Sequence, residues 1–195
     1  MNHGMETLRA ALASAALALT LAGCVAAVGA GAAAGASAAY DRRTAGTIID
    51  DEVIEIKALE AIVQDKALFD NAHINVTSYN NMVLLTGEVP DKPLRASAES
   101  AVARIEKVRG VYNELVIAEP SSMLSRSRDT IVTGKVKASL IRDKIAPGGR
   151  TKVVTEAGTV FLMGLLTRSE ANRITEIARR IGGVQRVVKL FEYLD

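Results

Sequence analysis

The sequence predicts an α+β protein made of two tandem αββαβ units, each with two helices packed on a three-stranded mixed sheet. The first observation is an internal repeat, in which three residue pairs share an offset of 77 positions: Val76 and Val153, Val83 and Val160, and Gly87 and Gly164. The second is that the spacing of apolar residues alternates between 3.6 residues, typical of a helix, and two residues, typical of a strand, in the same order in both copies. The chain is therefore interpreted as a tandem duplication.

Each unit begins with a helix and continues with a hairpin, a second helix and a last strand. Apolar residues at helical spacing predict helices over residues 50–66, 91–108, 127–144 and 167–181. Alternating apolar residues predict hairpins that turn at Asn80–Asn81 and at Ala157–Gly158. Runs rich in β-branched residues, 111–117 and 184–193, close the two units. Asp91 and Thr167 are expected to be N-caps.

The glycines of the repeat are interpreted as positions where a turn or close packing leaves no room for a side chain. Gly87 and Gly164 are expected to share one such role. Gly110–Val111 also aligns with Gly183–Val184, but at an offset of 73. This second offset predicts about one extra helical turn in the first copy.

The N-terminus has the layout of a lipoprotein signal peptide. A short polar start leads into an uncharged stretch that ends in a lipobox, Leu21-Ala22-Gly23-Cys24. We therefore expect residues 1–23 to be cleaved and Cys24 to be acylated, so that labelled palmitate is incorporated there. Val25 follows, and the absence of an aspartate there favours the outer membrane. The alternative is an uncleaved spanning helix, because residues 10–40 carry no charge, but the alanine and glycine content disfavours it.

Five segments follow from these patterns. Residues 1–23 are the signal peptide, residues 24–46 the acylated cysteine with a flexible Ala/Gly-rich tether, residues 47–119 the first domain, residues 120–126 a linker and residues 127–195 the second domain. Cys24 is the single cysteine, so packing alone must stabilise the mature protein.

The mature chain offers little for catalysis. Its single histidine, His73, is expected to be a solvated loop residue, so we expect no catalytic site, no metal site, no cofactor and no small-molecule substrate. Four acidic residues at the start of the first helix could suggest a cation site, but the helix dipole explains them better: Asp50, Asp51, Glu52 and Glu55.

The two domains differ in charge. Residues 47–119 hold 7 basic and 13 acidic residues, a net charge of −6, whereas residues 124–195 hold 14 basic and 7 acidic residues, a net charge of +7. A basic domain tethered to a bilayer has anionic headgroups as its nearest polyanion. The alternative is that the two domains attract each other. Nucleic acid is not expected, because basic residues interleaved with stacking aromatics are absent.

The predicted helix 127–144 has two apolar stripes, whereas packing on one sheet needs one. Val132, Val136 and Leu140 form the first stripe. The second stripe is bordered by basic residues, which suits shallow insertion into a membrane leaflet. Its apolar and basic residues are predicted to bind phospholipid: Ile131, Lys135, Lys137, Ala138, Ile141, Arg142, Lys144 and Ile145. The alternative is that the second stripe packs against the helix 167–181 or against the first domain.

The αββαβ order, the strands INVTSY and VFLMGL with Gly87 and Gly164, and the two Gly-Val pairs resemble BON domains. Two BON domains behind a lipobox are similar to the dual BON-domain outer-membrane lipoproteins. This resemblance implies a periplasm-facing protein on the outer membrane that supports membrane integrity, gathers at the cell-division site and binds anionic phospholipid through the first helix of its second domain. The alternative is a protein-interaction module that serves the outer-membrane assembly machinery.

Overall fold

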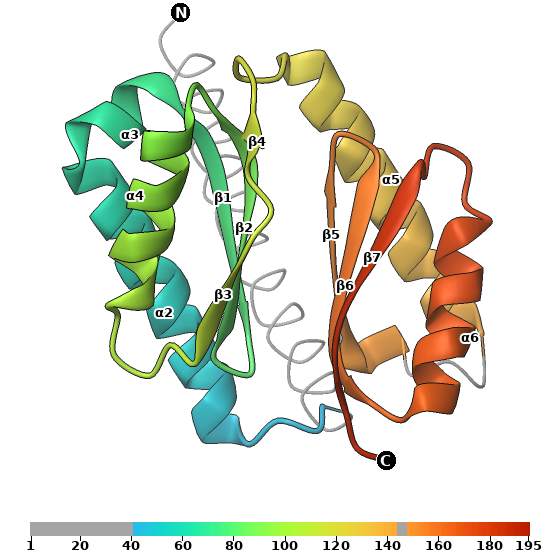
Figure 1. Ribbon diagram of the computed structural model, residues 1–195. Coiled ribbons are helices and arrows are strands. Elements are labelled where there is room, and N and C mark those ends of the chain that lie inside the picture. Colours follow the sequence, from blue (N-terminus) through green and yellow to red (C-terminus); the bar gives the residue numbers. More distant parts are fainter. Residues whose placement is uncertain (1–40, 144–147) are drawn as a thin grey trace, which may run out of the picture. The chain divides into compact units, whose positions relative to one another are not determined.

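The computed structural model describes residues 41–143 and 148–195, and residues 42–195 form one compact unit. The predicted pair of αββαβ domains is confirmed, with one mixed sheet in each (Figure 1). Among the described residues, no helix is both long enough and apolar enough to cross a membrane.

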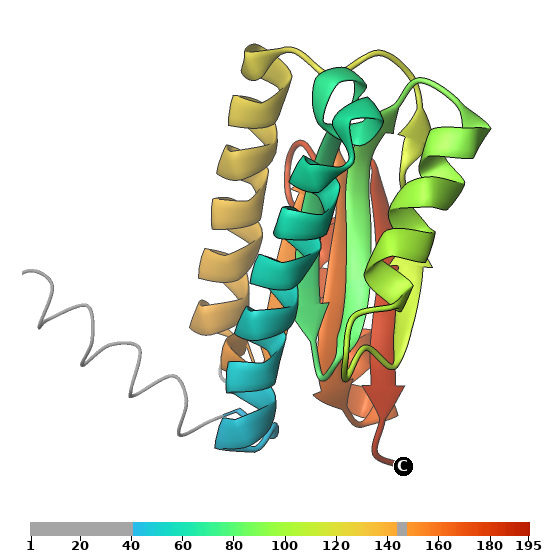
Figure 2. The same ribbon diagram turned by 90° about the vertical axis from the view of Figure 1, so that its left-hand side faces the viewer.

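The first domain contains α2 (Ala45–Gln64), α3 (Lys66–Asn71), β1 (His73–Tyr79), β2 (Met82–Val89), α4 (Lys92–Ala103), β3 (Gly110–Asn113) and β4 (Val116–Ile117). Strand β1 pairs antiparallel with β2, and β3 and β4 both pair parallel with β2. The closing run thus forms two short strands along one edge, where the sequence predicted one. Helices α2 and α4 cover the same face of this sheet (Figures 1 and 2).

The second domain contains α5 (Met123–Arg142), a short 3-10 helix (Gly148–Arg150), β5 (Thr151–Glu156), β6 (Thr159–Leu166), α6 (Arg168–Arg179) and β7 (Arg186–Tyr193). Strand β5 pairs antiparallel with β6, and β7 pairs parallel with β6 after the crossover through α6. Both helices bury apolar residues against the sheet, including Val136, Leu140 and Ile174.

Both hairpin turns lie where the sequence predicts them. Asn80 and Asn81 have φ angles of 53° and 64°, and Ala157 and Gly158 have φ angles of 46° and 71°. Two successive residues with positive φ define a type I′ turn, which suits the twist of a hairpin.

The two sheets pack against each other through the faces that the helices leave open. Tyr79 and Leu84 of the first domain share a buried apolar cluster with Phe161 and Met163 of the second. Tyr79 Oη also donates a hydrogen bond to the carbonyl oxygen of Arg150 (3.1 Å). The helices therefore lie on the outer sides of the sheet pair (Figure 1).

Two helices begin earlier than the sequence predicts. Helix α2 begins at Ala45, inside the predicted tether, because the side chain of Thr44 caps it by accepting a hydrogen bond from the amide of Thr47 (3.0 Å). Helix α5 begins at Met123, inside the predicted linker, because Ser122 caps it in the same way.

The predicted extra helical turn is also wrong. Helices α4 and α6 have 12 residues each, and their N-caps Asp91 and Thr167 lie 76 positions apart. The first copy has one extra residue, Pro90, between β2 and the cap. Lys107 (φ 71°) and Gly183 (φ 104°) occupy equivalent turns, so Gly110 and Gly183 are not counterparts.

Candidate functional site

The exposed face of α5 is the candidate lipid-binding site. Val132, Val136 and Leu140 are buried in the core of the second domain, as predicted. Ile131 and Ile141, on the opposite side of the helix, are 57% and 73% exposed. The second apolar stripe therefore faces solvent and does not pack against α6 or the first domain.

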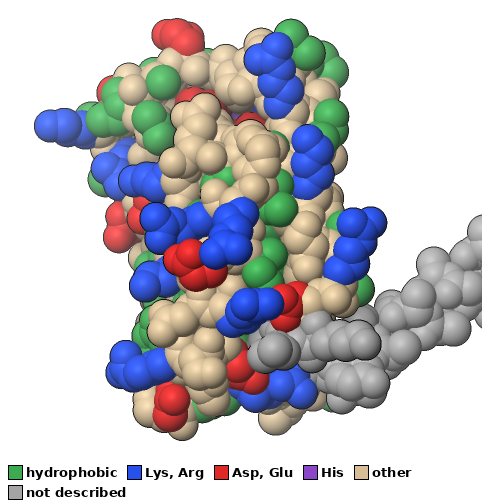
Figure 3. All heavy atoms as spheres, turned by 90° about the vertical axis from the view of Figure 1, so that its right-hand side faces the viewer, with side chains coloured by type: hydrophobic (Ala, Val, Ile, Leu, Met, Phe, Trp, Pro, Cys, Tyr) green, Lys and Arg blue, Asp and Glu red, His purple; other side chains and the backbone are tan. Residues whose placement is uncertain are grey.

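Basic side chains border this apolar stripe. At 100° per residue, Lys135 and Arg142 lie on one edge and Lys137 on the other. All three are exposed, and among the described residues none of them has an acidic partner within ion-pair distance. Figure 3 shows Lys and Arg side chains spread over the helix-bearing side of this domain. Ala138 is exposed on the same stripe.

Attraction between the domains does not account for these charges. Ion pairs between a basic residue of the second domain and an acid of the first include Lys152 with Glu55 (3.3 Å) and Arg186 with Glu114 (3.8 Å). A third pair has the reverse polarity and joins Arg109 to Glu192 (2.9 Å). None of these pairs involves α5.

The start of the folded unit is fixed to the second domain. Both terminal nitrogens of Arg42 bond the carboxylate of Glu170 in α6 (2.7 and 2.9 Å), and Arg42 also donates to the carbonyl oxygen of Leu165 (3.0 Å). These hydrogen bonds lower the pKa of Glu170 below its ordinary value. One helical turn further on, Arg173 binds Asp143, the C-cap of α5. Helix α6 therefore holds both Arg42 and the C-terminal end of α5.

Three predicted positions lie outside the described residues. They are Cys24, Lys144 and Ile145. Of the residues predicted to bind phospholipid, the structure describes six, which share the side of α5 that faces away from the sheet: Ile131, Lys135, Lys137, Ala138, Ile141 and Arg142.

The helix-dipole explanation of the acidic residues in α2 is wrong. The helix begins at Ala45 and has no acidic residue in its first turn. Asp51 is instead buried against the hairpin turn, where it accepts hydrogen bonds from the amides of Asn80 and Asn81 (both 2.8 Å). Asp129 of α5 likewise accepts hydrogen bonds from the amides of Ala157 and Gly158 in the second hairpin turn. Asp51 and Asp129 therefore have a structural role.

Helix α2 carries an exposed apolar stripe that the sequence analysis missed. Ile54, Ala58 and Ile62 face the core, but a wider set of apolar residues faces solvent: Ile49, Val53, Ile56, Leu59 and Val63. The sequence showed one broad apolar arc on this helix. The width of the arc, greater than one sheet can cover, was the available signal.

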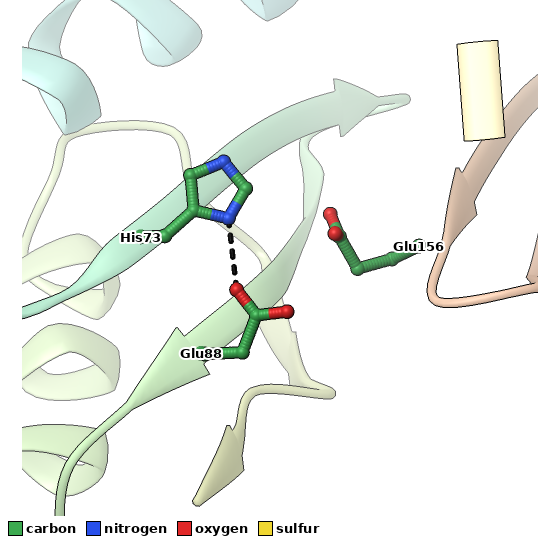
Figure 4. Close-up of side chains that lie close together, drawn as sticks. All are labelled: His73, Glu88 and Glu156. Atoms are coloured by element: carbon green, nitrogen blue, oxygen red, sulfur yellow. Dashed lines mark hydrogen bonds and ion pairs between the residues drawn. The ribbon is translucent and has the colours of Figure 1, made fainter. Parts of the chain in front are cut away.

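His73 is not a solvated loop residue. It begins β1, its side chain is 17% exposed, and its Nδ1 lies 3.0 Å from Glu88 Oε2. Glu156 of the second domain lies opposite them (Figure 4). Burial raises the pKa of Glu156 above its ordinary value, although a hydrogen bond from the Asn75 side chain opposes this shift.

Comparison with known proteins identifies the family of both domains. Residues 50–119 and 128–195 each match the BON domain. The chain belongs to the BON-domain family, as a dual BON-domain protein of the DolP type.

Three relatives support this assignment. The chain is 41% identical to the outer membrane lipoprotein DolP of Haemophilus influenzae, over 90% of this chain and 91% of that protein. It is 36% identical to a 21 kDa hemolysin of Actinobacillus pleuropneumoniae, over 80% of each chain. It is 30% identical to the osmotically-inducible protein Y of Escherichia coli, over 73% of this chain and 72% of that protein. None of these names denotes an enzyme.

Proposed function

We propose that this protein is a non-enzymatic outer-membrane lipoprotein, anchored through Cys24 and facing the periplasm, whose second BON domain binds anionic phospholipids. The observation that carries this proposal is the exposed face of α5, where Ile131 and Ile141 lie between basic side chains that have no acidic partner among the described residues. The similarity to a protein named as an outer membrane lipoprotein supports the location.

The chemistry of a leaflet surface matches this face. Apolar side chains on one side of a helix enter the boundary between headgroups and acyl chains, while long cationic side chains reach the phosphates. Each Lys or Arg near an anionic surface contributes about 1 kcal/mol. Arg42 bonds Glu170 of α6 while Arg43 pairs with Asp51 of α2, so both domains hold the point where the chain from Cys24 enters the folded unit.

The experiment is liposome flotation of the fragment 42–195, which keeps the Arg42 contacts. We expect the fragment to float with vesicles of anionic lipid and to remain with the soluble fraction when vesicles are zwitterionic. Raising the salt should weaken binding, because the screening length is about 8 Å at physiological ionic strength. Reversal of Lys135, Lys137 and Arg142 to Glu should abolish the preference for anionic lipid.

Two matched controls separate α5 from general charge and general hydrophobicity. Reversal of Arg179, Arg180 and Lys189, which are also exposed, changes the net charge equally but should leave most of the binding intact. Ile141→Asp should weaken the binding that remains at high salt, whereas Ile56→Asp on α2, where the side chain is 66% exposed, should not. Equal losses within either pair would contradict a lipid site on α5.

We also propose that lipid binding supports outer-membrane integrity, in part at the division site. A strain that lacks the protein should become sensitive to detergents that the outer membrane normally excludes. The parent gene should restore resistance and the charge-reversed α5 variant should not. A fluorescent fusion of the parent, but not of that variant, should gather at midcell.

A second candidate function is protein binding by the first domain, as a module that serves the outer-membrane assembly machinery. The exposed apolar stripe of α2 favours it, because this domain is net acidic and unsuited to an anionic surface. Cross-linking in cells separates the two candidates. A partner complex lost in Ile56→Asp but retained in Ile141→Asp would assign protein binding to α2.

A further inference from the structure

We infer that His73, Glu88 and Glu156 form a binding site for one divalent transition-metal ion of the Zn²⁺ class, which joins the two BON domains. His73 and Glu88 belong to β1 and β2 of the first domain, and Glu156 ends β5 of the second (Figure 4). One potential ligand atom from each residue lies within 4.8 Å of the other two.

The distances suit a single ion. Zinc binds nitrogen and oxygen ligands at about 2.0 to 2.2 Å, so tetrahedral ligand atoms lie about 3.3 Å apart. His73 Nδ1 and Glu88 Oε2 are already 3.0 Å apart. The Glu156 carboxylate, within 4.8 Å of the other two potential ligand atoms, would have to move closer to complete the site.

The charge balance also favours a cation. Glu88 and Glu156 are both buried, and burial of carboxylates is costly unless they are paired. Among the described residues, neither forms an ion pair with a lysine or arginine. The basic side chain that lines the adjoining cavity is Arg126, which is exposed. A divalent ion would balance the two carboxylates.

Neighbouring polar groups support the site. The Asn75 side chain donates to Glu156 Oε2 (2.8 Å), and the amide of Ser121 donates to Glu88 Oε2 (3.2 Å), so both carboxylates are held in place from outside the cluster. The hydroxyl of Ser121 is buried without a hydrogen-bond partner among the described residues. A metal-bound water beside Glu88 would give this hydroxyl a partner.

The ligand types indicate the class of metal. An imidazole with two carboxylates suits zinc and its neighbours in the first transition row, whereas calcium and magnesium prefer oxygen ligands alone. A cavity of about 400 Å³, lined by His73, Asn75 and Glu156 among others, gives an ion access to the cluster.

The test uses the mature full chain in detergent, freed of metal by a chelator and prepared without a polyhistidine tag. His73 is the single histidine after residue 23, so the imidazole NMR signals report on it alone. We expect one equivalent of Zn²⁺ to shift its Nδ1 signal and to raise the melting temperature, and excess Mg²⁺ to do neither.

Two variants complete the test. Glu156→Gln removes the charge but keeps an oxygen that accepts from Asn75, and should weaken Zn²⁺ binding more than about 10-fold. Glu192→Gln removes one carboxylate elsewhere at the domain boundary and should leave the affinity unchanged. Imidazole signals that do not move in excess Zn²⁺, or equal affinity in the parent and Glu156→Gln, would overturn the inference. The NMR result on the parent chain decides the matter even if a variant fails to fold.

Discussion

Replacement of glycine by alanine at three positions should give three different effects on the free energy of unfolding. Gly87 has a φ of +116°, and a Cβ built on it would lie 2.0 Å from the carbonyl oxygen of His73. Such a backbone conformation costs a residue with a side chain about 1 to 3 kcal/mol. The clash with backbone adds to that cost because β1 and β2 must separate. We expect Gly87→Ala to lose about 3 kcal/mol or more.

Gly164 occupies the same place in the repeat but in a different environment. A Cβ there would lie 3.0 Å from the carbonyl oxygen of Arg150, and no positive φ is involved. The backbone at Arg150 must move by a few tenths of an ångström, so the loss should be about 1 kcal/mol. Gly134 lies exposed in α5 with nothing within 4 Å of a Cβ. Gly134→Ala should therefore stabilise the protein by about 0.5 to 1 kcal/mol, because alanine favours the helix.

Urea unfolding of the fragment 42–195, followed by circular dichroism, measures all three changes. The midpoint should rise in the order Gly87→Ala, Gly164→Ala, parent, Gly134→Ala. The reasoning would be refuted if Gly87→Ala and Gly134→Ala shifted the midpoint in the same direction. Equal losses at Gly87 and Gly164 would show that the repeat position, and not the local backbone, sets the cost.

Three further changes test other parts of the chain. Cys24→Ala should abolish incorporation of labelled palmitate, since no other cysteine can carry the lipid; retained label would remove the anchor. Arg42 lowers the pKa of Glu170 in the folded protein, so this contact stabilises the fold at pH values above the pKa of glutamate in the unfolded chain. That stabilisation is lost as the pH falls through the pKa of Glu170 in the folded protein. Arg42→Gln should therefore flatten the acid limb of the stability-versus-pH curve, and an unchanged limb would exclude this linkage. Asp51→Ala should cost about 2 to 4 kcal/mol in thermal unfolding, because two turn amides lose their acceptor, and a cost below 1 kcal/mol would mean that water replaces it.

Local sequence rules predicted the parts of the fold that depend on neighbouring residues. The Asn80–Asn81 turn follows from alternating apolar residues around two side chains that tolerate positive φ. The caps at Asp91 and Thr167 follow from side chains that accept hydrogen bonds from amides three residues ahead. Each signal lies within a few residues of the structure that it determines.

Two of the predictions that failed depend on contacts between distant residues, and one on a single local cap. Nothing near His73 indicates that Glu88 and a glutamate of the other domain lie beside it. Gly183 matched Gly110 by residue type, but equivalence is set by the pairing of the strands, which places Lys107 at the matching turn. The start of α2 was missed because Ala45 and Gly46 continue the composition of the preceding segment, and the decisive cap is a single threonine.

The sheet-to-sheet arrangement leaves each domain with a helix surface of its own. Each sheet has one face on its own helices and the other in contact with the second sheet, so the outer sides of the helices, those of α2 and α5 among them, remain exposed. On α2 this side is apolar within an acidic domain, and on α5 it is apolar within a basic one.

These outer sides contribute little to the core, so they can diverge without loss of the fold. Ile56→Asp and Ile141→Asp should each change the unfolding free energy by less than about 0.5 kcal/mol, since both side chains are mostly exposed. Urea unfolding of each variant checks this. If either substitution costs several kcal/mol, its side chain contributes to folding, and its effect on lipid or partner binding would then reflect stability and not recognition.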